Sequence, residues 1–341
     1  MIQSAKDIPL HELFSPELNV KYLIPKYQRE YSWKKENWED LINDILGEDD
    51  SEEGPFLGSI ICVNKTSDAF SPALEIIDGQ QRLTTISLLY SAIHAKLKEI
   101  ENTMDDESKS ELINLKYKII QKKNPNETKL ELSYQNNNFE DYKEILEESQ
   151  ILKAKEGRPK NIGNKRIYKA YQFFATRLEK MKYEEVKKLL AKINSSHIIK
   201  IEVNTNSDAF ILFESINNRG VPLSAIDLIK NNLLSTLEKK KYKKIEDSFD
   251  EWKKIIENLT DDPKNQERFL RHYYNAFKHN ETIKVKIHEI AKERIEFQDF
   301  FIESWPMQHS ASCNAYCFIE KDKRKIKLQF VKKIPGKLLG E

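Results

Sequence analysis

The chain has 341 residues, of which 33% are charged and 39% are hydrophobic. This length exceeds a comfortable single hydrophobic core, so we expect one large domain or two packed domains. The net charge of +1 excludes the overall basic character of proteins that bind nucleic acid through phosphate contacts alone. No apolar run approaches the roughly 20 residues that cross a bilayer. Three cysteines do not make a disulfide framework, so the cytoplasm is the expected location.

The first informative segment mixes aromatic and polar residues and runs Leu23-Ile-Pro-Lys-Tyr-Gln-Arg-Glu-Tyr-Ser-Trp33. It precedes a predicted helix with Ser32 as the expected N-cap. Four apolar residues of that helix follow the i, i+3, i+4, i+7 spacing of a buried stripe: Trp38, Leu41, Ile42 and Ile45. Gln28 and Arg29 lie in the extended segment before the helix. This segment is either an aromatic part of the core covered by Arg29 or a polar wall of a nucleotide pocket.

Two short buried strands are expected next, at residues 56–63 and 74–77. Gly58, inside the first strand, indicates either the close approach of another group or simple packing. Cys62 in the same strand is expected to lie in the core. The second strand ends at Asp78-Gly79, where a helical pattern starts at once. Its apolar positions are Leu83, Ile86, Leu89, Tyr90, Ile93 and Leu97.

The strand–glycine–helix turn at Gly79 is the strongest candidate site. Glycine permits a sharp turn, and the first N–H groups of the helix, together with its dipole, favour an anion. Arg82 adds a planar cation suited to phosphate oxygens, and Gln80 and Gln81 can both donate and accept hydrogen bonds. The alternative is a turn that binds nothing, with Arg82 as an ordinary surface or salt-bridge residue. No Gly-x-x-x-x-Gly-Lys-Ser/Thr loop is present, which excludes a P-loop enzyme.

Composition divides the chain into four regions. Residues 1–100 carry the strand–helix core, and 101–163 form a polar helical insertion ending in a connector. Residues 164–295 are mainly helical with one alternating strand at 198–203, and 296–341 form a basic tail. The predicted fold class is therefore α+β, a sheet-containing core followed by a mainly helical domain.

Two further clusters of polar residues need an interpretation. Asn217-Asn218-Arg219-Gly220 forms a second glycine turn, which is either structural or part of the site. His309, Cys313 and Cys317 could bind zinc, but a clear fourth ligand is missing, so no metal site is assigned.

Four segments, in one order, resemble the N-terminal domain of the GmrSD restriction family. They are Ile24-Pro-x-Tyr-Gln-Arg-x-Tyr-x-Trp33, Phe56-Leu-Gly-Ser-Ile60, Ile77-Asp-Gly-Gln-Gln-Arg-x-Thr-Thr85 and Phe213-Glu-Ser-Ile-Asn-Asn-Arg-Gly220 with the residues up to Lys230. The resemblance covers roughly residues 8–290. It implies a small mixed sheet similar to ParB and sulfiredoxin, in which Gly79-Gln-Gln-Arg82 occupies the place of their phosphate loops.

The resemblance also implies an activity and the residues that perform it. The chain would bind and hydrolyse a nucleoside triphosphate with Mg²⁺, as the sensor or regulatory subunit of a system that restricts modified or foreign DNA. The implied catalytic residues are Asp78, Gln81 and Arg82. The implied nucleotide-binding residues are Tyr27, Gln28, Arg29, Gly58, Gly79, Gln80, Thr84, Asn217 and Arg219. In this hypothesis either glutamine of the turn orients water, and Asp78 binds Mg²⁺, accepts a proton or caps the turn.

Longer relatives carry a C-terminal nuclease domain of His-Asn-His type, with a His-x-x-Pro-like signature that this sequence lacks. We therefore expect DNA as a direct or indirect partner, a separate nuclease subunit or domain, and no DNA cleavage by this chain. Two alternatives are a ParB-like DNA-binding module without turnover and a ParB-like nuclease. The presence of both Gln-Gln-Arg and Tyr-Gln-Arg favours nucleotide handling.

Overall fold

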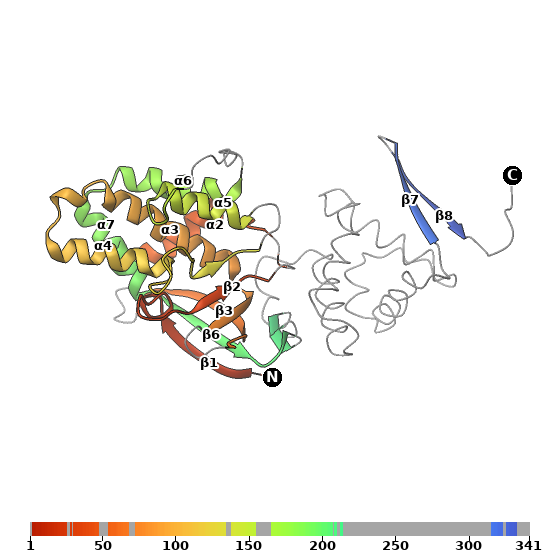
Figure 1. The fold of residues 1–341 in the computed structure, drawn as a ribbon, viewed down its shortest axis with the longest axis horizontal. Coiled ribbons are helices and arrows are strands. Elements are labelled where there is room, and N and C mark those ends of the chain that lie inside the picture. Colours follow the sequence, from red (N-terminus) through yellow and green to blue (C-terminus); the bar gives the residue numbers. More distant parts are fainter. Residues whose placement is uncertain are drawn as a thin grey trace. The chain divides into compact units, whose positions relative to one another are not determined.

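A computed structural model describes residues 2–25, 28, 30–47, 54–67, 72–133, 138–154, 165–206, 208–209 and 212–213, and the backbone of 315–322 and 325–332. The chain divides into two compact units, 1–218 and 219–341. In the first unit, a layer of helices covers one face of a sheet (Figure 1). In the second, the described backbone is an antiparallel hairpin of β7 (Ala315–Asp322) and β8 (Lys325–Lys332).

The sheet of the first unit has six strands in the order β1-β6-β3-β4-β2-β5. They are β1 (Ile2–Pro9), β2 (Lys21–Leu23), β3 (Phe56–Asn64), β4 (Ala73–Asp78), β5 (Leu130–Glu131) and β6 (His197–Val203). Pairing is mixed: β4 is antiparallel to β3 but parallel to β2, and β3 is parallel to β6. Because β2 and β4 run side by side in the same direction, the residues that follow β2 reach the end of β4 where the candidate turn begins. The mixed sheet with its helices confirms the α+β class.

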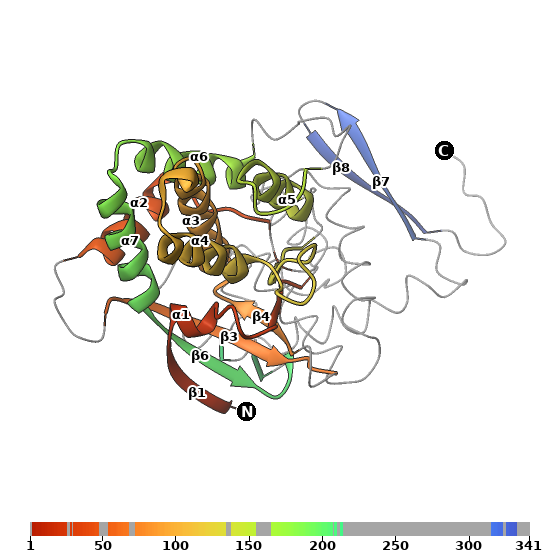
Figure 2. The ribbon, with the colours of Figure 1, turned by 60° about the vertical axis from the view of Figure 1, so that its left-hand side comes forward.

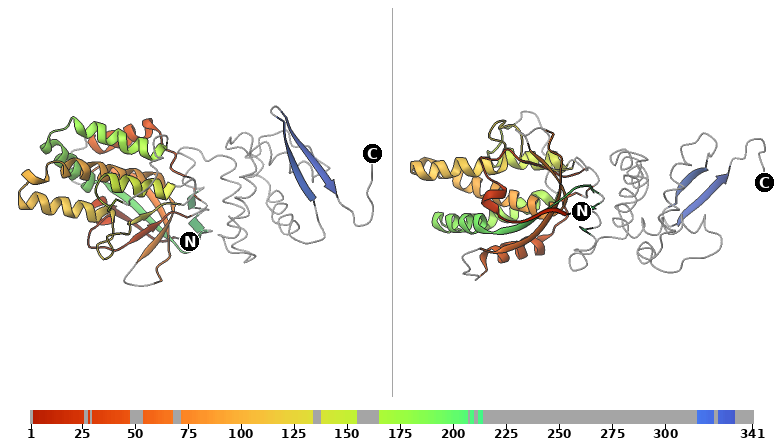
Figure 3. Two further views of the ribbon diagram at one scale, coloured as in Figure 1. Left: turned by 45° about the horizontal axis from the view of Figure 1, so that its top comes forward. Right: turned by 90° about the horizontal axis from the view of Figure 1, so that it is seen from below.

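The helix that follows the candidate turn, α3 (Gln80–Lys98), is the centre of the helical layer. Its neighbours include α4 (Asp106–Ile119), α6 (Arg166–Glu179) and α7 (Tyr183–Ser195). No charged residue occurs between Leu83 and Ala95, so α3 can be buried on several sides at once. The layer also contains α2 (Lys35–Leu46) and α5 (Asn138–Glu148), with short helices α1 (Leu10–Leu13) and η1 (Glu101–Thr103) beside it. Figure 3 shows this layer from two further directions.

Several predicted elements are confirmed within a residue or two. The strands expected at 56–63, 74–77 and 198–203 appear as β3, β4 and β6. The expected stripe of α2 is buried, and Cys62 lies in the core. Ser32, however, is not the N-cap of α2. The helix starts at Lys35 after the cap residue Lys34, whose backbone N–H donates to Asn37 Oδ1 at 3.1 Å.

The sheet extends beyond the core of 1–100 that composition suggested. β6 lies between β1 and β3, as Figure 2 shows, and β5 comes from the expected insertion. The parallel pairing of β3 with β6 requires a crossover, and the intervening helices supply it. β1 was not predicted because its sequence is polar and most of its residues are exposed at the sheet edge. The helices expected between 214 and 295 lie outside the described residues.

No helix in the described part of the chain combines the length and apolar character needed to cross a membrane.

His94 is a buried histidine of α3, and the folded protein favours its neutral form. Its Nδ1–H donates to the backbone oxygen of Ser149 at 2.9 Å. Burial, with smaller contributions from Lys116 and Lys98, lowers the pKa of His94 to about 4. In the unfolded chain the same imidazole has its ordinary pKa near 6.5.

We therefore expect His94 to make the protein less stable in acid. Between about pH 6.5 and 4 the unfolded chain binds a proton that the folded chain does not, so stability falls as pH falls through this window. The loss reaches up to about 3 kcal/mol at the low end. His94→Gln, measured by urea unfolding at several pH values, should flatten this slope. An unchanged slope would show that other groups cause the acid loss.

Candidate functional site

A single residue, Gly79, joins β4 to α3. Its backbone is left-handed, with φ +90° and ψ 4°, a conformation that side-chain-bearing residues rarely adopt. A Cβ atom at this position would lie 2.5 Å from Ile60 Cγ2 and 3.2 Å from the backbone oxygen of Ser59. The left-handed backbone and the lack of room for a Cβ atom therefore both require glycine. The turn brings the first residues of α3 against β3.

The N-terminus of α3 is left uncapped by this turn. Gly79 has no side chain to accept a hydrogen bond, and the first helical bond runs from the Leu83 N–H to the Gly79 oxygen. Within the part of the chain that the structure describes, the backbone N–H groups of Gln80, Gln81 and Arg82 make no hydrogen bond. Three such donors at the start of a 19-residue helix present a positive partial charge to an anion.

Arg82 places its guanidinium between the turn and β3. Its Nη1 donates to the Ser59 oxygen at 2.8 Å, its one hydrogen bond with the described residues. The planar group lies so close to Gly58 that a Cβ there would be 2.8 Å from Nη2. Burial lowers the pKa of Arg82, whereas the nearby carboxylates of Asp78 and Asp44 raise it. The result is a partly desolvated cation with donors to spare, since a guanidinium carries five N–H groups.

The Arg82 guanidinium thus lies directly against Gly58, and we expect Gly58→Ala to displace it. The new methyl group would overlap it, and φ of +96° adds backbone strain of about 1–3 kcal/mol. For the nucleotide binding proposed below, the affinity measured by calorimetry should fall about tenfold, because a mispositioned Arg82 loses the strength of a charge-assisted bond. Gly47→Ala is the matched control, since its Cβ meets nothing nearer than 3.4 Å. Equal affinities in the two variants would contradict this role for Gly58.

Two glutamines connect the turn to the segment after β2. Gln28 Nε2 donates to the Ile77 oxygen at 2.7 Å, and Gln80 Nε2 donates to Gln28 Oε1 at 3.1 Å. Gln80 Oε1 accepts no hydrogen bond from the described residues. The structure thus brings Gln28 against Gln80, 52 residues apart. Tyr27 and Arg29, expected on the same wall, lie outside the described residues.

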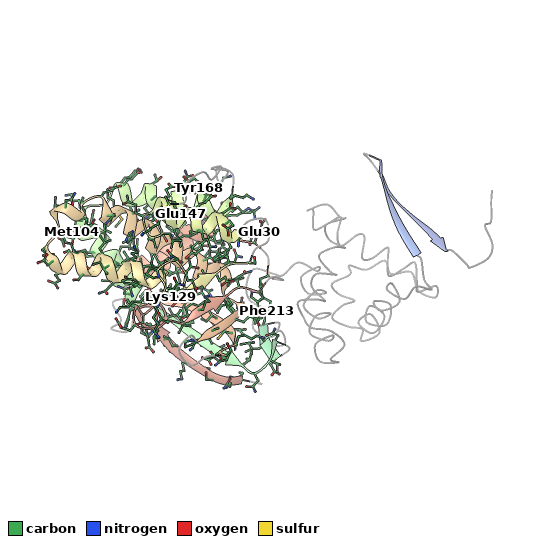
Figure 4. All side chains as sticks on the ribbon, viewed as in Figure 1. Glu30, Met104, Lys129, Glu147, Tyr168 and Phe213 are labelled. Carbon is green, nitrogen blue, oxygen red and sulfur yellow. The ribbon has the colours of Figure 1, made fainter. Side chains whose placement is uncertain are left out.

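Gln81 and Thr84, also expected at the site, make hydrogen bonds to protein groups. Gln81 Oε1 accepts the backbone N–H groups of Ser32 at 2.7 Å and Trp33 at 3.3 Å. Its Nε2 donates to the backbone oxygen of Glu30 at 3.2 Å; Glu30 is labelled in Figure 4. The Thr84 hydroxyl donates to the Gln80 oxygen at 2.8 Å, and the residue is 3% exposed. These contacts use both lone pairs of Gln81 Oε1, one of its two Nε2 donors and the hydroxyl proton of Thr84, and no sequence pattern predicted them.

A family model described as the N-terminal domain of GmrSD restriction endonuclease matches residues 10–234. The match spans about two thirds of the 341 residues and includes β2 to β6 and the candidate turn. The chain belongs to the GmrSD N-terminal domain family. Membership makes it a component of a restriction or defence system. A search of curated proteins finds no match.

The remaining site residues of this GmrSD N-terminal domain fall into two groups. Asp78, the last residue of β4, is partly buried and close enough to Arg82 to act on its charge. Asn217 and Arg219 lie outside the described residues. Asp44 and the Ser59 oxygen, which also act on Arg82, were not predicted. No spacing signal links α2 to the turn, so only the folded structure reveals Asp44.

Proposed function

We propose that this GmrSD N-terminal domain binds a nucleoside triphosphate at the Gly79 turn and hydrolyses it with Mg²⁺. The observation that carries the proposal is the partly desolvated Arg82 guanidinium beside the uncapped N-terminus of α3. The described residues offer few hydrogen-bond acceptors to the guanidinium and to the backbone N–H groups at the start of α3. A bound anion would supply such acceptors. Phosphate oxygens accept hydrogen bonds from guanidinium and backbone N–H groups alike.

The proposed chemistry follows from the charges around the turn. Arg82 and the N-terminal amides of α3 hold the phosphates and offset the charge that develops on the transferred phosphoryl group. Gln80, whose Oε1 accepts no bond from the described residues, orients the attacking water. Asp78 would hold the metal, because a carboxylate beside phosphates needs a cation between them. Among the described residues there is no cluster of three or more potential metal ligands, and Mg²⁺ commonly uses one or two carboxylates plus substrate phosphates. Mg²⁺ supplies charge neutralisation when bound.

In the restriction system this domain would be the sensor or regulatory subunit in the cytoplasm. A net charge of +1 gives no overall attraction to DNA. We propose that modified or phage DNA acts on the domain directly or through a partner. A separate His-Asn-His-type nuclease, as a subunit or domain, would cut the DNA when the nucleotide is turned over.

Phosphate release from each ribo- and deoxynucleoside triphosphate tests this function. The purified chain is incubated with Mg²⁺ and plasmid, glucosylated or phosphorothioated DNA, or without DNA. We expect free phosphate and intact DNA. Tight nucleotide binding without release would point to a module that binds but does not hydrolyse. Nicking that persists through purification and disappears in Asp78→Asn would make the domain itself a nuclease.

A further inference from the structure

We infer that Gln81 is a positioning residue that fixes residues 30–33 against α3, and that it does not orient the attacking water. Its carboxamide makes three hydrogen bonds to the backbone of this segment, with Ser32, Trp33 and Glu30. Gln81 is buried, with 7% of the residue exposed. Residues 30–33 belong to no helix or strand, so these three bonds take the place of the backbone hydrogen bonds that hold a strand in a sheet.

The chemistry of the carboxamide separates the two roles. An amide oxygen has two lone pairs, and both are used by the N–H groups of Ser32 and Trp33. Of the two N–H donors on Nε2, one is used by the Glu30 oxygen. A carboxamide that orients water by accepting one of its protons needs a lone pair that no other donor uses. Gln81 has no acceptor left for this, whereas Gln80 keeps its Oε1.

A second residue of α3 holds the same segment one turn further along. The Tyr31 hydroxyl lies 2.7 Å from Thr85 Oγ1 and accepts the indole N–H of Trp38 at 2.8 Å. Gln81 and Thr85 stand four apart and therefore share a face of α3. Arg166 Nη1 also donates to the Ser32 oxygen at 3.3 Å. Residues 30–33 are thus bound from α2, α3 and α6.

The position of this segment matters because it is continuous with Gln28. Gln28 bridges the Ile77 oxygen and Gln80 Nε2 at the turn. Release of residues 30–33 would loosen the chain that carries Gln28, and with it the orientation of Gln80. Gln81 therefore acts on the site through the backbone, without touching substrate.

Amide hydrogen exchange, followed by NMR on the nucleotide-free protein, tests this role independently of any activity. In Gln81→Leu the N–H groups of Ser32 and Trp33 should exchange about tenfold faster or more, because each loses its acceptor. Gln80→Leu is the matched control and should leave both protected. Gln81→Glu keeps the acceptor lone pairs but sets an oxygen against the Glu30 oxygen in place of the Nε2 donor, so it should restore protection of Ser32 and Trp33 only in part. Unchanged exchange in Gln81→Leu overturns the inference; if that variant does not fold, unchanged exchange in Gln81→Met does so.

Steady-state kinetics adds a second test, which rests on the proposed hydrolysis. We expect Gln80→Leu to lower kcat strongly, and Gln81→Leu to lower it less, because Gln81 acts on Gln80 only through residues 30–33 and Gln28. A fall in kcat for Gln81→Leu equal to that for Gln80→Leu would contradict a positioning role. If the wild-type chain releases no phosphate, the proposed function fails, while the exchange experiment still decides the role of Gln81.

Discussion

Replacing Arg82 by alanine is expected to reduce triphosphate hydrolysis by about 100-fold or more while the protein stays folded. The guanidinium lies in the first turn of α3, makes one hydrogen bond with the described residues and is partly desolvated. A charge held in such surroundings stabilises a transition state more than it would in water, because little solvent screens it. Its loss would also remove the cation that acts on the carboxylate of Asp78 beside the proposed phosphate site.

Two further variants make the Arg82→Ala result interpretable. Arg82→Lys keeps the charge but loses the planar fork, so it should recover only part of the activity. Arg177→Ala removes an exposed arginine of α6 and should leave hydrolysis unchanged. Thermal unfolding of each variant shows whether the fold survives. A folded Arg82→Ala protein with wild-type turnover would remove Arg82 from the site.

Replacing Gly79 is expected to cost both stability and nucleotide binding. At φ +90° a residue with a side chain is strained by about 1–3 kcal/mol. The overlap of its Cβ with Ile60 Cγ2 at 2.5 Å adds a further cost of about 1–3 kcal/mol, because the neighbouring core is well packed. Gly79→Val should suffer more than Gly79→Ala, since its branched side chain also approaches the N-terminal amides of α3.

Urea unfolding and nucleotide titration of the Gly79 variants separate the two effects. Gly47→Ala, at a glycine with φ −47°, is the control and should change stability little. For Gly79→Ala we expect a lower urea midpoint and, at temperatures where it is folded, weaker nucleotide binding. If a folded Gly79→Val protein binds nucleotide as the wild type does, the turn is not the phosphate site.

The local structure around the site could be predicted because it depends on neighbours in sequence. The apolar run that ends at Asp78-Gly79 predicted β4 and the glycine turn. The apolar residues that follow recur about every 3.6 positions, which predicted α3. The buried stripe of α2 followed from the same periodicity. Family resemblance added the expectation that Gln28 belongs to the same site, and the structure brings it against Gln80.

The partners of polar side chains could not be predicted in the same way. A carboxamide has donors and acceptors for water, nucleotide or backbone, and the sequence does not say which of these Gln81 contacts. The position of β6 between β1 and β3 could not be predicted from the sequence either, because periodicity indicates a strand but not its neighbours in the sheet. Asp44 reaches Arg82 through the packing of α2, which no motif encodes.

A structure of the protein with Mg²⁺ and a non-hydrolysable nucleoside triphosphate tests the central claim most directly. We expect phosphate oxygens to accept hydrogen bonds from the Arg82 guanidinium and from the backbone N–H groups of Gln80 and Gln81, with Gln81 still bound to residues 30–33. Phosphates bound elsewhere on the chain, with the N-terminus of α3 in contact only with water, would contradict the account.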